Sequence, residues 1–217
     1  MRKIILYIAM SLDGYIADAN GGVSWLRGQD PDSESEGSYP EFVRDIDTVV
    51  MGWETYYQVI TELSPDEWVY EDLMTYVITH REEASSEKIR FVHESPFDLI
   101  RNLKEMDGKD IWICGGASIA RQLMQDGMID RFYISVIPVL LGAGVRLFGE
   151  LPEALELRLM ETKSYNGIVD CRTQIRKALK YEEDKSIEES GLKTVEDRNG
   201  NRSQQIQMDK RTGKLCH

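Results

Sequence analysis

The residues with the clearest chemical potential are a glycine pair, Gly115-Gly116, inside the segment DIWICGGASIARQ of residues 110–122. An apolar run precedes the pair, and apolar residues at helical spacing follow it, which predicts a strand, a tight turn and a helix. A helix that begins on glycines presents free backbone N–H groups and the positive end of its dipole. No Cβ then blocks an approaching anion. The segment predicts either a phosphate-binding turn or an ordinary strand-to-helix connection.

Metal-based and nucleophilic chemistry receive no support from the sequence. The three cysteines are far apart and odd in number, which argues against a disulfide framework and fits a reducing cytoplasm. The three histidines are scattered, with no HxxxH pair and no CxxC motif near them, so we expect no metal site. Spacing brings no serine or cysteine together with a histidine, and hydrolysis by a nucleophilic side chain is not indicated.

Charge and hydropathy narrow the classes of partner. The chain has 217 residues and a formal net charge of −12, so nucleic-acid phosphate would be repelled and no nucleic-acid partner is expected. Apolar runs are too short to span a bilayer, and we expect no membrane partner. The N-terminal segment MRKIILYIAMSLDGYIAD is interrupted by Ser11, Asp13 and Asp18, and it predicts a first β-strand rather than a signal peptide.

Strands and helices alternate over the first two thirds of the chain, which predicts a mainly parallel sheet with helices on both faces. Strands are expected at residues 2–10, 15–17, 48–51, 76–79, 89–92, 111–114, 131–140, 155–162 and 167–177, and helices at 39–45, 54–63, 97–106 and 118–126. The last two strands would pair as a hairpin around Asn166-Gly167 and make the sheet mixed. Pro138, inside the long strand 131–140, suggests that this strand is an edge or carries a bulge.

Two segments fall outside this pattern. Residues 29–38 are acidic and rich in serine, which is typical of a mobile surface loop or a lid. Residues 181–217 contain one aromatic residue and many charges of both signs, too little apolar surface to offset the entropy of ordering. We therefore expect one domain over residues 1–180, followed by a flexible, charged tail in which a weak hairpin could form around Asn199-Gly200.

Five pieces of the chain, taken in order, carry a resemblance to a known family. They are IAMSLDGYIAD, GGVSW, DTVVMGWETYY, ICGGASIARQL and DRFYISVIPVLLGAGVRLF. Together they resemble the dihydrofolate-reductase-like superfamily, and most closely the branch related to the reductase domain of bifunctional riboflavin-biosynthesis enzymes. The resemblance covers roughly residues 2–178. It implies a three-layer α/β fold with an eight-stranded, mostly parallel mixed sheet, and a reduced nicotinamide cofactor at the carboxyl ends of the central strands.

The resemblance also assigns roles to individual residues. It implies that the main chain of Ala9 and Ile16 meets the nicotinamide carboxamide and that the hydroxyl of Ser135 meets the substrate ring through water. The implied contacts to the rest of the cofactor come from Gly52, Thr55, Thr79, Arg81, Gly115, Gly116, Ala117, Ser118 and Ile119. Each of these residues also has an ordinary structural interpretation, as sheet core, helix first turn or solvated loop. Arg81 is the candidate clamp for a 2′-phosphate, because a guanidinium can form two parallel hydrogen bonds to a phosphate.

This sequence departs from the family pattern in ways that bear on cofactor and substrate. Many members carry a basic residue where this chain has Trp53 followed by Glu54, so NADPH is the expected cofactor and NADH stays open. Ala120 occupies the place of a tyrosine that many dihydrofolate reductases set beside the nicotinamide. For the catalytic acid, spacing selects Glu36, within the loop-like acidic stretch, and Asp13 is a second candidate that equally suits a turn.

The favoured hypothesis is an NAD(P)H-dependent oxidoreductase that reduces a pteridine- or pyrimidine-like heterocycle. It would resemble 5-amino-6-(5-phosphoribosylamino)uracil reductase of riboflavin biosynthesis. The alternatives are a dihydrofolate reductase and a non-catalytic nucleotide-binding module, the latter favoured by the missing helix-borne carboxylate. The apolar strand of residues 131–139 and the final hairpin would support a homodimer.

Overall fold

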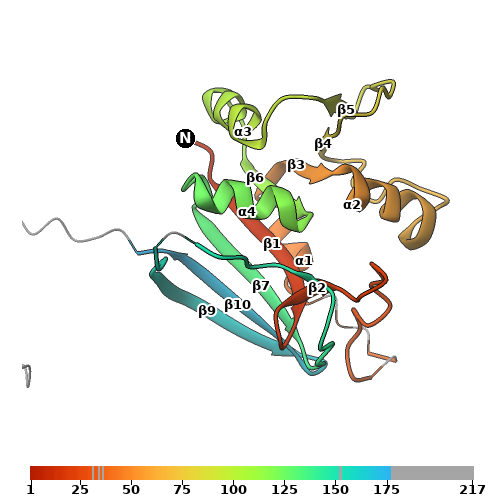
Figure 1. The fold of residues 1–217 in the computed structure, drawn as a ribbon, viewed down its shortest axis with the longest axis vertical. Coiled ribbons are helices and arrows are strands. Elements are labelled where there is room, and N and C mark those ends of the chain that lie inside the picture. The colour runs from red at the N-terminus through yellow and green to blue at the C-terminus, as the bar shows by residue number, and fades with distance from the viewer. Residues whose placement is uncertain (31, 34, 36, 152, 177–217) are drawn as a thin grey trace, which may run out of the picture. The chain divides into compact units, whose positions relative to one another are not determined.

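Eight strands form one twisted sheet in the order β5-β4-β3-β6-β1-β7-β10-β9, and six of them are parallel (Figure 1). The computed structural model describes residues 1–30, 32, 33, 35, 37–151 and 153–176. The strands of this sheet are β1 (Ile4–Ser11), β3 (Ile46–Gly52), β4 (Met74–Ile78), β5 (Ile89–Val92), β6 (Asp110–Gly115), β7 (Arg131–Ile137), β9 (Leu157–Tyr165) and β10 (Ile168–Ile175). β10 runs antiparallel to β7, and β9 antiparallel to β10. The expected eight-stranded, mostly parallel mixed sheet is confirmed.

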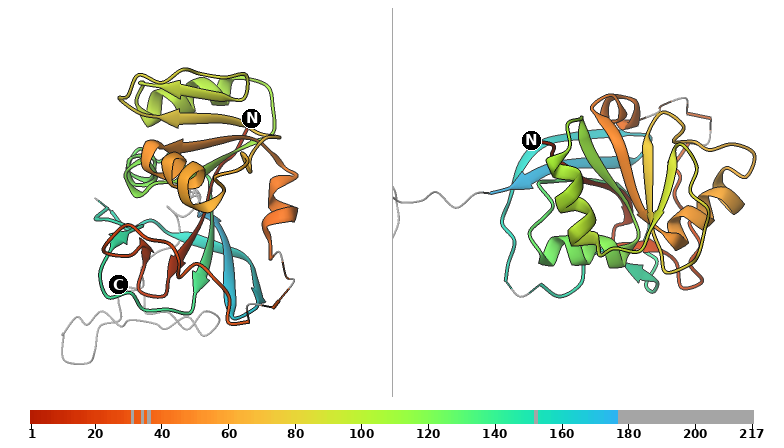
Figure 2. Two further views of the ribbon diagram at one scale, coloured as in Figure 1. Left: turned by 90° about the vertical axis from the view of Figure 1, so that its right-hand side faces the viewer. Right: turned by 90° about the horizontal axis from the view of Figure 1, so that it is seen from above.

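Helices cover both faces of the sheet, so the described part of the domain has three layers (Figure 2). The helices are α1 (Tyr39–Val43), α2 (Trp53–Gln58), which continues as a π-helical turn over Val59–Leu63, α3 (Pro96–Glu105) and α4 (Ala117–Gln125). α3 and α4 pack on one face over an aliphatic core. α1 and α2 lie on the other face, whose core is aromatic and centres on Phe42 and Trp112.

Local sequence signals explain where α3 begins and ends. The Ser95 side chain accepts a hydrogen bond from the backbone N–H of Asp98, at 3.1 Å, and Pro96 fits the first helical position because it needs no intrahelical donor. Leu99, Ile100 and Leu103 share the buried face at helical spacing. The chain continues into β6, whose carboxyl end starts α4.

The structure corrects the expectation for the strand that was predicted to include Pro138. β7 ends at Ile137, before the proline, and it lies inside the sheet between β1 and β10. Pro138 therefore removes no ladder donor, and the chain turns away through a hydrogen bond from the Val139 N–H to the Ile137 carbonyl. The segment 15–17 is strand β2 (Tyr15–Ala17), which pairs with β8 (Val145–Arg146) in a separate two-stranded sheet.

Residues 29 and 30, at the start of the acidic segment 29–38, form hydrogen bonds with Asn166 in the turn between β9 and β10. The Asn166 side chain accepts a hydrogen bond from the Asp30 N–H at 2.7 Å and donates one to the Asp30 carbonyl at 2.9 Å. The Gln29 N–H donates to the Asn166 carbonyl. The predicted hairpin around Asn166-Gly167 thus both joins β9 to β10 and holds this segment. Pro31, Glu34 and Glu36 lie outside the described residues, as do Pro152 and residues 177–217, which include the expected tail and its Asn199-Gly200 turn.

None of the described helices is long and apolar enough to cross a membrane. Within the described ranges, no group of three or more His, Cys, Asp or Glu side chains is placed to hold a metal ion.

Candidate functional site

The carboxyl ends of the parallel strands meet at one edge of the sheet, where open α/β sheets bind their ligands. The turn from β6 to α4 and the turn from β3 to α2 lie next to each other at this edge. A Cβ added to Gly115 would lie 3.2 Å from the Thr55 Oγ1 atom, and one added to Gly52 would lie 3.2 Å from Ile119 Cδ1. Two segments that are far apart in the sequence therefore meet in one cluster, formed by Gly52 and Thr55 from one and Gly115 and Ile119 from the other.

The start of α4 is shaped to accept an anion. Its N-cap residue, Gly116, is extended, with φ −86° and ψ −172°, and no side chain caps the helix. Gly115 has φ 154°, a conformation that favours glycine. The first backbone N–H groups of an α-helix lack intrahelical acceptors, so those of Ala117 and Ser118 remain available to a ligand. The exposed Ser118 hydroxyl already accepts a hydrogen bond from the Gln122 side chain, at 3.2 Å.

Beyond Leu6, β1 and β6 are no longer paired, and we call the stretch of β1 that faces β6 there, residues 7–11, the slot. The parallel pairing of these two strands ends at Leu6 and Ile113, whereas β1 stays paired with β7 as far as Ser11. The Lys3 carbonyl accepts a hydrogen bond from β6 and the Ile4 carbonyl accepts one from the β7 side, so odd-numbered residues of β1 face β6. Because backbone groups alternate along a strand, the N–H and carbonyl of Ala9 point into the slot as one donor and one acceptor. Such a pair matches a carboxamide.

Ile16 lies on β2, which contacts β1, and its side chain packs against the aliphatic core. The structure therefore places it near the same end of β1 but gives its side chain a packing role.

Arg81 and Trp53 meet at the ends of β4 and β3. The Arg81 guanidinium carbon lies 4.8 Å from the centre of the Trp53 ring, a cation–π arrangement. The buried Thr79 hydroxyl accepts a hydrogen bond from the Arg81 N–H at 3.0 Å, and its carbonyl contacts the His93 ring nitrogen at 2.8 Å. The Arg81 guanidinium thus lies over one face of Trp53, the first residue of α2, and Glu54 follows Trp53 in the first turn of that helix.

The Asp13 carboxylate connects the turn between β1 and β2 to the loop after β7 by hydrogen bonds. Its carboxylate accepts hydrogen bonds from the Ser11 hydroxyl at 2.6 Å and from the backbone N–H groups of Leu141 and Gly142 at 3.1 and 2.8 Å. These hydrogen bonds, the one from Ser11 first, lower the pKa of Asp13 to about 2. A carboxyl group that stays ionised and whose oxygens are occupied suits a turn better than proton donation.

A row of paired residues crosses the sheet through Ser135, the residue that the sequence predicts to contact the substrate. Ala9 of β1 pairs with Ser135 of β7, and Ser135 pairs with Asp170 of β10. The buried Ser135 hydroxyl donates a hydrogen bond to Asp170 Oδ1 at 2.6 Å. Asp170 was not selected from the sequence, because its hydrogen-bond partner Ser135 lies on another strand, 35 residues earlier in the chain.

The structure thus brings the predicted cofactor residues to one edge and gives Ser135 a buried carboxylate as its neighbour. Glu36, the predicted acid, lies outside the described residues. Glu41, the acidic residue that α1 supplies, is ion-paired with Arg172, which lowers the pKa of its carboxyl group. Burial raises the pKa of the Cys114 thiol to about 12, so this cysteine is a poor nucleophile.

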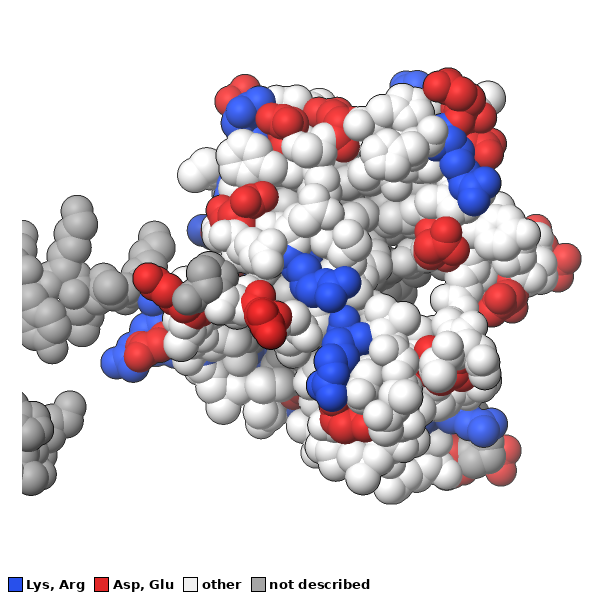
Figure 3. Space-filling model, viewed as in Figure 1, with Lys and Arg blue, Asp and Glu red and all other residues white. Residues whose placement is uncertain are grey.

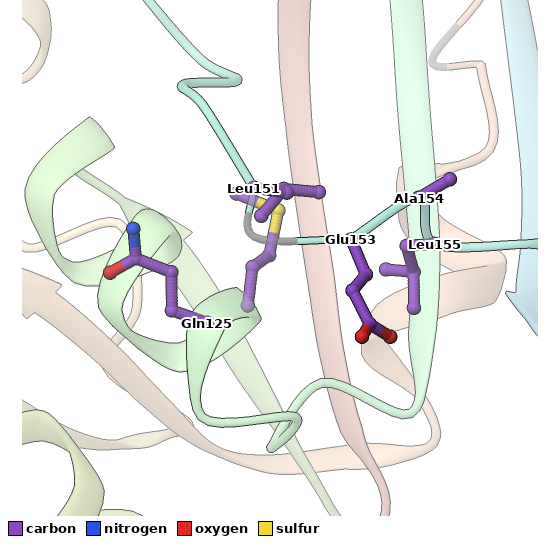
Figure 4. A pocket seen from close by; sticks show the side chains of 6 residues that line it. Gln125, Leu151, Glu153, Ala154 and Leu155 are labelled. Carbon is purple, nitrogen blue, oxygen red and sulfur yellow. The ribbon is translucent and has the colours of Figure 1, made fainter.

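A separate pocket lies at the other end of α4, lined by Met124, Gln125, Leu151, Glu153, Ala154 and Leu155 (Figure 4). It is next to the last turn of the helix, away from the free N–H groups at Gly116.

Figure 3 shows acidic side chains mostly around the rim of one face of the molecule and a few basic ones near its middle.

Comparison with known proteins shows the family of the chain. Residues 2–169 match the model of the RibD C-terminal domain. The chain belongs to the RibD C-terminal domain family. The uncharacterized protein YwjB of Bacillus subtilis (strain 168) is 39% identical over 171 residues, which cover 77% of this chain and 95% of YwjB.

Solved structures show the same architecture. A Shewanella sp. PV-4 protein called "Putative riboflavin biosynthesis protein" superposes with a TM-score of 0.70 at 27% identity, over 81% of this chain and 99% of that one. The dihydrofolate reductase of Enterococcus faecalis, solved with NADP(H), shares the fold at a TM-score of 0.58 and 16% identity, over 81% of this chain and 97% of that reductase. The RibD C-terminal domain family and the dihydrofolate-reductase-like fold were both expected from the sequence, and both are confirmed.

Proposed function

We propose that this chain is a nicotinamide-dependent reductase of a pteridine- or pyrimidine-like heterocycle, with NADPH as its cofactor. The observation that carries the proposal is the slot at the carboxyl ends of β1 and β6, bordered by the glycine turn of α4. Membership of the RibD C-terminal domain family supports an oxidoreductase, and the NADP(H) complex of the Enterococcus reductase supports the choice of cofactor.

The residues at the site fit such a cofactor. The main chain of Ala9 would hold the carboxamide, and the N–H groups after Gly116 would hold the pyrophosphate, since a glycine leaves room there. Thr55 adds a hydroxyl beside the same turn. Arg81 would bind the 2′-phosphate. When bound, the nicotinamide supplies the hydride, and the protein positions the two rings and excludes water.

Ser135 is the proposed contact to the substrate ring, and a C=N or C=O group on that ring is the proposed site of reduction. The substrate would resemble 5-amino-6-(5-phosphoribosylamino)uracil, in keeping with the riboflavin-related family. Glu36 and Asp13 stay as the proton donors predicted from the sequence, but the hydrogen bonds of Asp13 favour a structural role for it.

The test is the substitution Gly116→Ala. A Cβ at Gly116 would lie 3.5 Å from Thr55 Oγ1, an ordinary contact, and the backbone there is extended, so the fold should tolerate it. The new methyl group would occupy the place of the phosphate. We expect an unchanged melting temperature and a dissociation constant for NADPH at least tenfold higher, measured by isothermal titration calorimetry.

Gln125→Ala, at an exposed position in the last turn of the same helix, is the matched control and should bind NADPH as the wild type does. Wild-type protein that binds neither NADPH nor NADH would refute the proposal. Binding without oxidation of the cofactor across a panel of pteridines and aminopyrimidines would favour a non-catalytic module instead.

A further inference from the structure

Asp170 is a buried carboxylate that the cofactor site does not use. The residue is 2% exposed and lies on β10, two strands from Ala9 in the row that passes through Ser135. Neighbouring strands are about 4.8 Å apart, so the backbones at Ala9 and Asp170 are separated by roughly 10 Å. Paired residues of a sheet project their side chains to the same face, so the Asp170 carboxylate lies on the face that carries Ser135, the proposed substrate contact.

The two carboxylate oxygens of Asp170 differ in their hydrogen-bond partners. Oδ1 accepts hydrogen bonds from the hydroxyls of Ser135, at 2.6 Å, and Tyr165, at 3.2 Å. Oδ2 is buried and has no hydrogen-bond partner among the described residues. A buried acceptor without a donor is costly, and such a group needs an explanation. The two hydroxyls fix the carboxyl plane and leave one oxygen for an external donor.

Two cations at neighbouring positions of the sheet, Lys163 and Arg172, are engaged with other partners. Lys163, directly opposite Asp170 on β9, donates to the Gly37 carbonyl at 3.3 Å. Arg172 is paired with Glu41 and Glu161, at 3.3 and 3.0 Å. The Asp170 carboxylate is therefore held by neutral hydroxyls rather than by an ion pair. The adjacent Tyr7 has a raised pKa, through burial first and the charge of Asp170 second, and its hydroxyl stays neutral.

We propose that Asp170 is a specificity-determining residue whose Oδ2 accepts a hydrogen bond from an N–H edge of the heterocyclic substrate. An ionised carboxylate only accepts hydrogen bonds, so it favours amino or amidine edges and disfavours ether or carbonyl edges. Ser135 and Tyr165 position the carboxylate. This inference rests on the proposed function for the identity of the ligand class, and it adds the atom that selects the substrate.

The test compares two pyrimidines of similar shape by isothermal titration calorimetry, in the presence of NADPH and again without it. 2,4-Diaminopyrimidine has N–H donors on its edge, and 2,4-dimethoxypyrimidine has none. We expect the wild type to bind the diamino compound at least tenfold more tightly, and Asp170→Asn to lose that preference while still binding NADPH. Tyr165→Phe, which keeps the carboxylate but removes one hydroxyl, should show a smaller loss and provides the test if Asp170→Asn does not fold.

Glu161→Gln is the matched control, because it removes a negative charge from an exposed position on the same face of the neighbouring strand. It should keep the wild-type preference. Equal affinity for the two pyrimidines, binding of neither, or a preference that persists in Asp170→Asn would overturn the inference. Failure to bind NADPH would instead count against the proposed function, so the two failures are distinguishable.

Discussion

Two aspartates near the carboxyl ends of the strands show how local hydrogen bonds assign different roles to the same side chain. Asp13 has donors on both oxygens, two of them backbone N–H groups, and is used to tie the β1–β2 turn to the loop after β7. Asp170 has both donors on one oxygen, and its buried second oxygen has no hydrogen-bond partner within the part of the chain that the structure describes. The sequence analysis placed Asp13 among the catalytic candidates and did not select Asp170, because the donors at Leu141 and Gly142, and that at Ser135, lie far from these aspartates in the sequence.

Asp13→Asn should change the response of the protein to acid. The folded-state pKa of Asp13, about 2, is below its ordinary value of 3.8, so the ionised carboxylate stabilises the fold above pH 4. That contribution is lost as the pH falls from about 4 toward 2. In urea titrations, we expect the stability difference between wild type and Asp13→Asn to be largest at neutral pH and to shrink toward pH 2. A constant difference over this range would contradict the role given to Asp13.

Arg81→Ala should separate the two nicotinamide cofactors. Loss of a charge-assisted hydrogen bond to a phosphate costs about 1.5–3 kcal/mol, which corresponds to a dissociation constant roughly ten- to a hundredfold higher. We expect this loss for NADPH and less than a twofold change for NADH, measured by calorimetry. Arg101→Ala, on an exposed position of α3, is the control. Equal losses for both cofactors would remove Arg81 from the 2′-phosphate site.

At the scale of elements, periodicity and glycine placement were sufficient to predict the eight strands of the main sheet, the helices on both faces and the hairpin at Asn166-Gly167, but not the short strand β8. The Gly115-Gly116 turn was identified because its signal is contiguous: strand, glycines, helix. What could not be predicted depends on contacts between distant segments. The β1–β6 pairing ends at Leu6 and Ile113, before Ala9, and no pattern in the sequence of either strand predicts this early end.

The attachment of residues 29–30 to the β9–β10 hairpin gives a prediction for one turn residue. Asn166 has φ 45°, which glycine also adopts, so Asn166→Gly should keep the turn and lose only the two side-chain hydrogen bonds to Asp30. We expect faster amide hydrogen exchange at residues 28–30 and a loss of about 1 kcal/mol in the free energy of unfolding. Asn102→Ala, at an exposed amide on α3, should change neither quantity. Unchanged exchange in Asn166→Gly would show that the attachment does not depend on this side chain.

At the scale of the whole molecule, the edge strand β9 and its neighbour β10 leave several apolar side chains in solvent. Leu157, Leu159, Met160 and Val169 are 41%, 57%, 53% and 43% exposed. Exposed apolar groups gathered on one pair of strands are typical of an interface. They agree with the homodimer expected from the sequence, and we propose that a second copy of the chain covers them.

Light scattering after size-exclusion chromatography should therefore give twice the chain mass for the wild type at micromolar concentration. Leu159→Lys should shift the protein toward the monomer, because a charge would have to be buried in the interface. Lys163→Ala, on the opposite face of the same strand, should stay dimeric. A wild-type monomer at all concentrations would exclude this interface.

The central claim is that a nicotinamide cofactor binds in the slot between β1 and β6 against the glycine turn of α4. Amide hydrogen exchange measured by mass spectrometry with and without saturating NADPH tests it most directly. We predict slower exchange in peptides that cover residues 7–11 and 115–120, with little change around residues 151–155, which line the separate pocket. Unchanged exchange at both predicted segments, or protection confined to that pocket, would contradict the account.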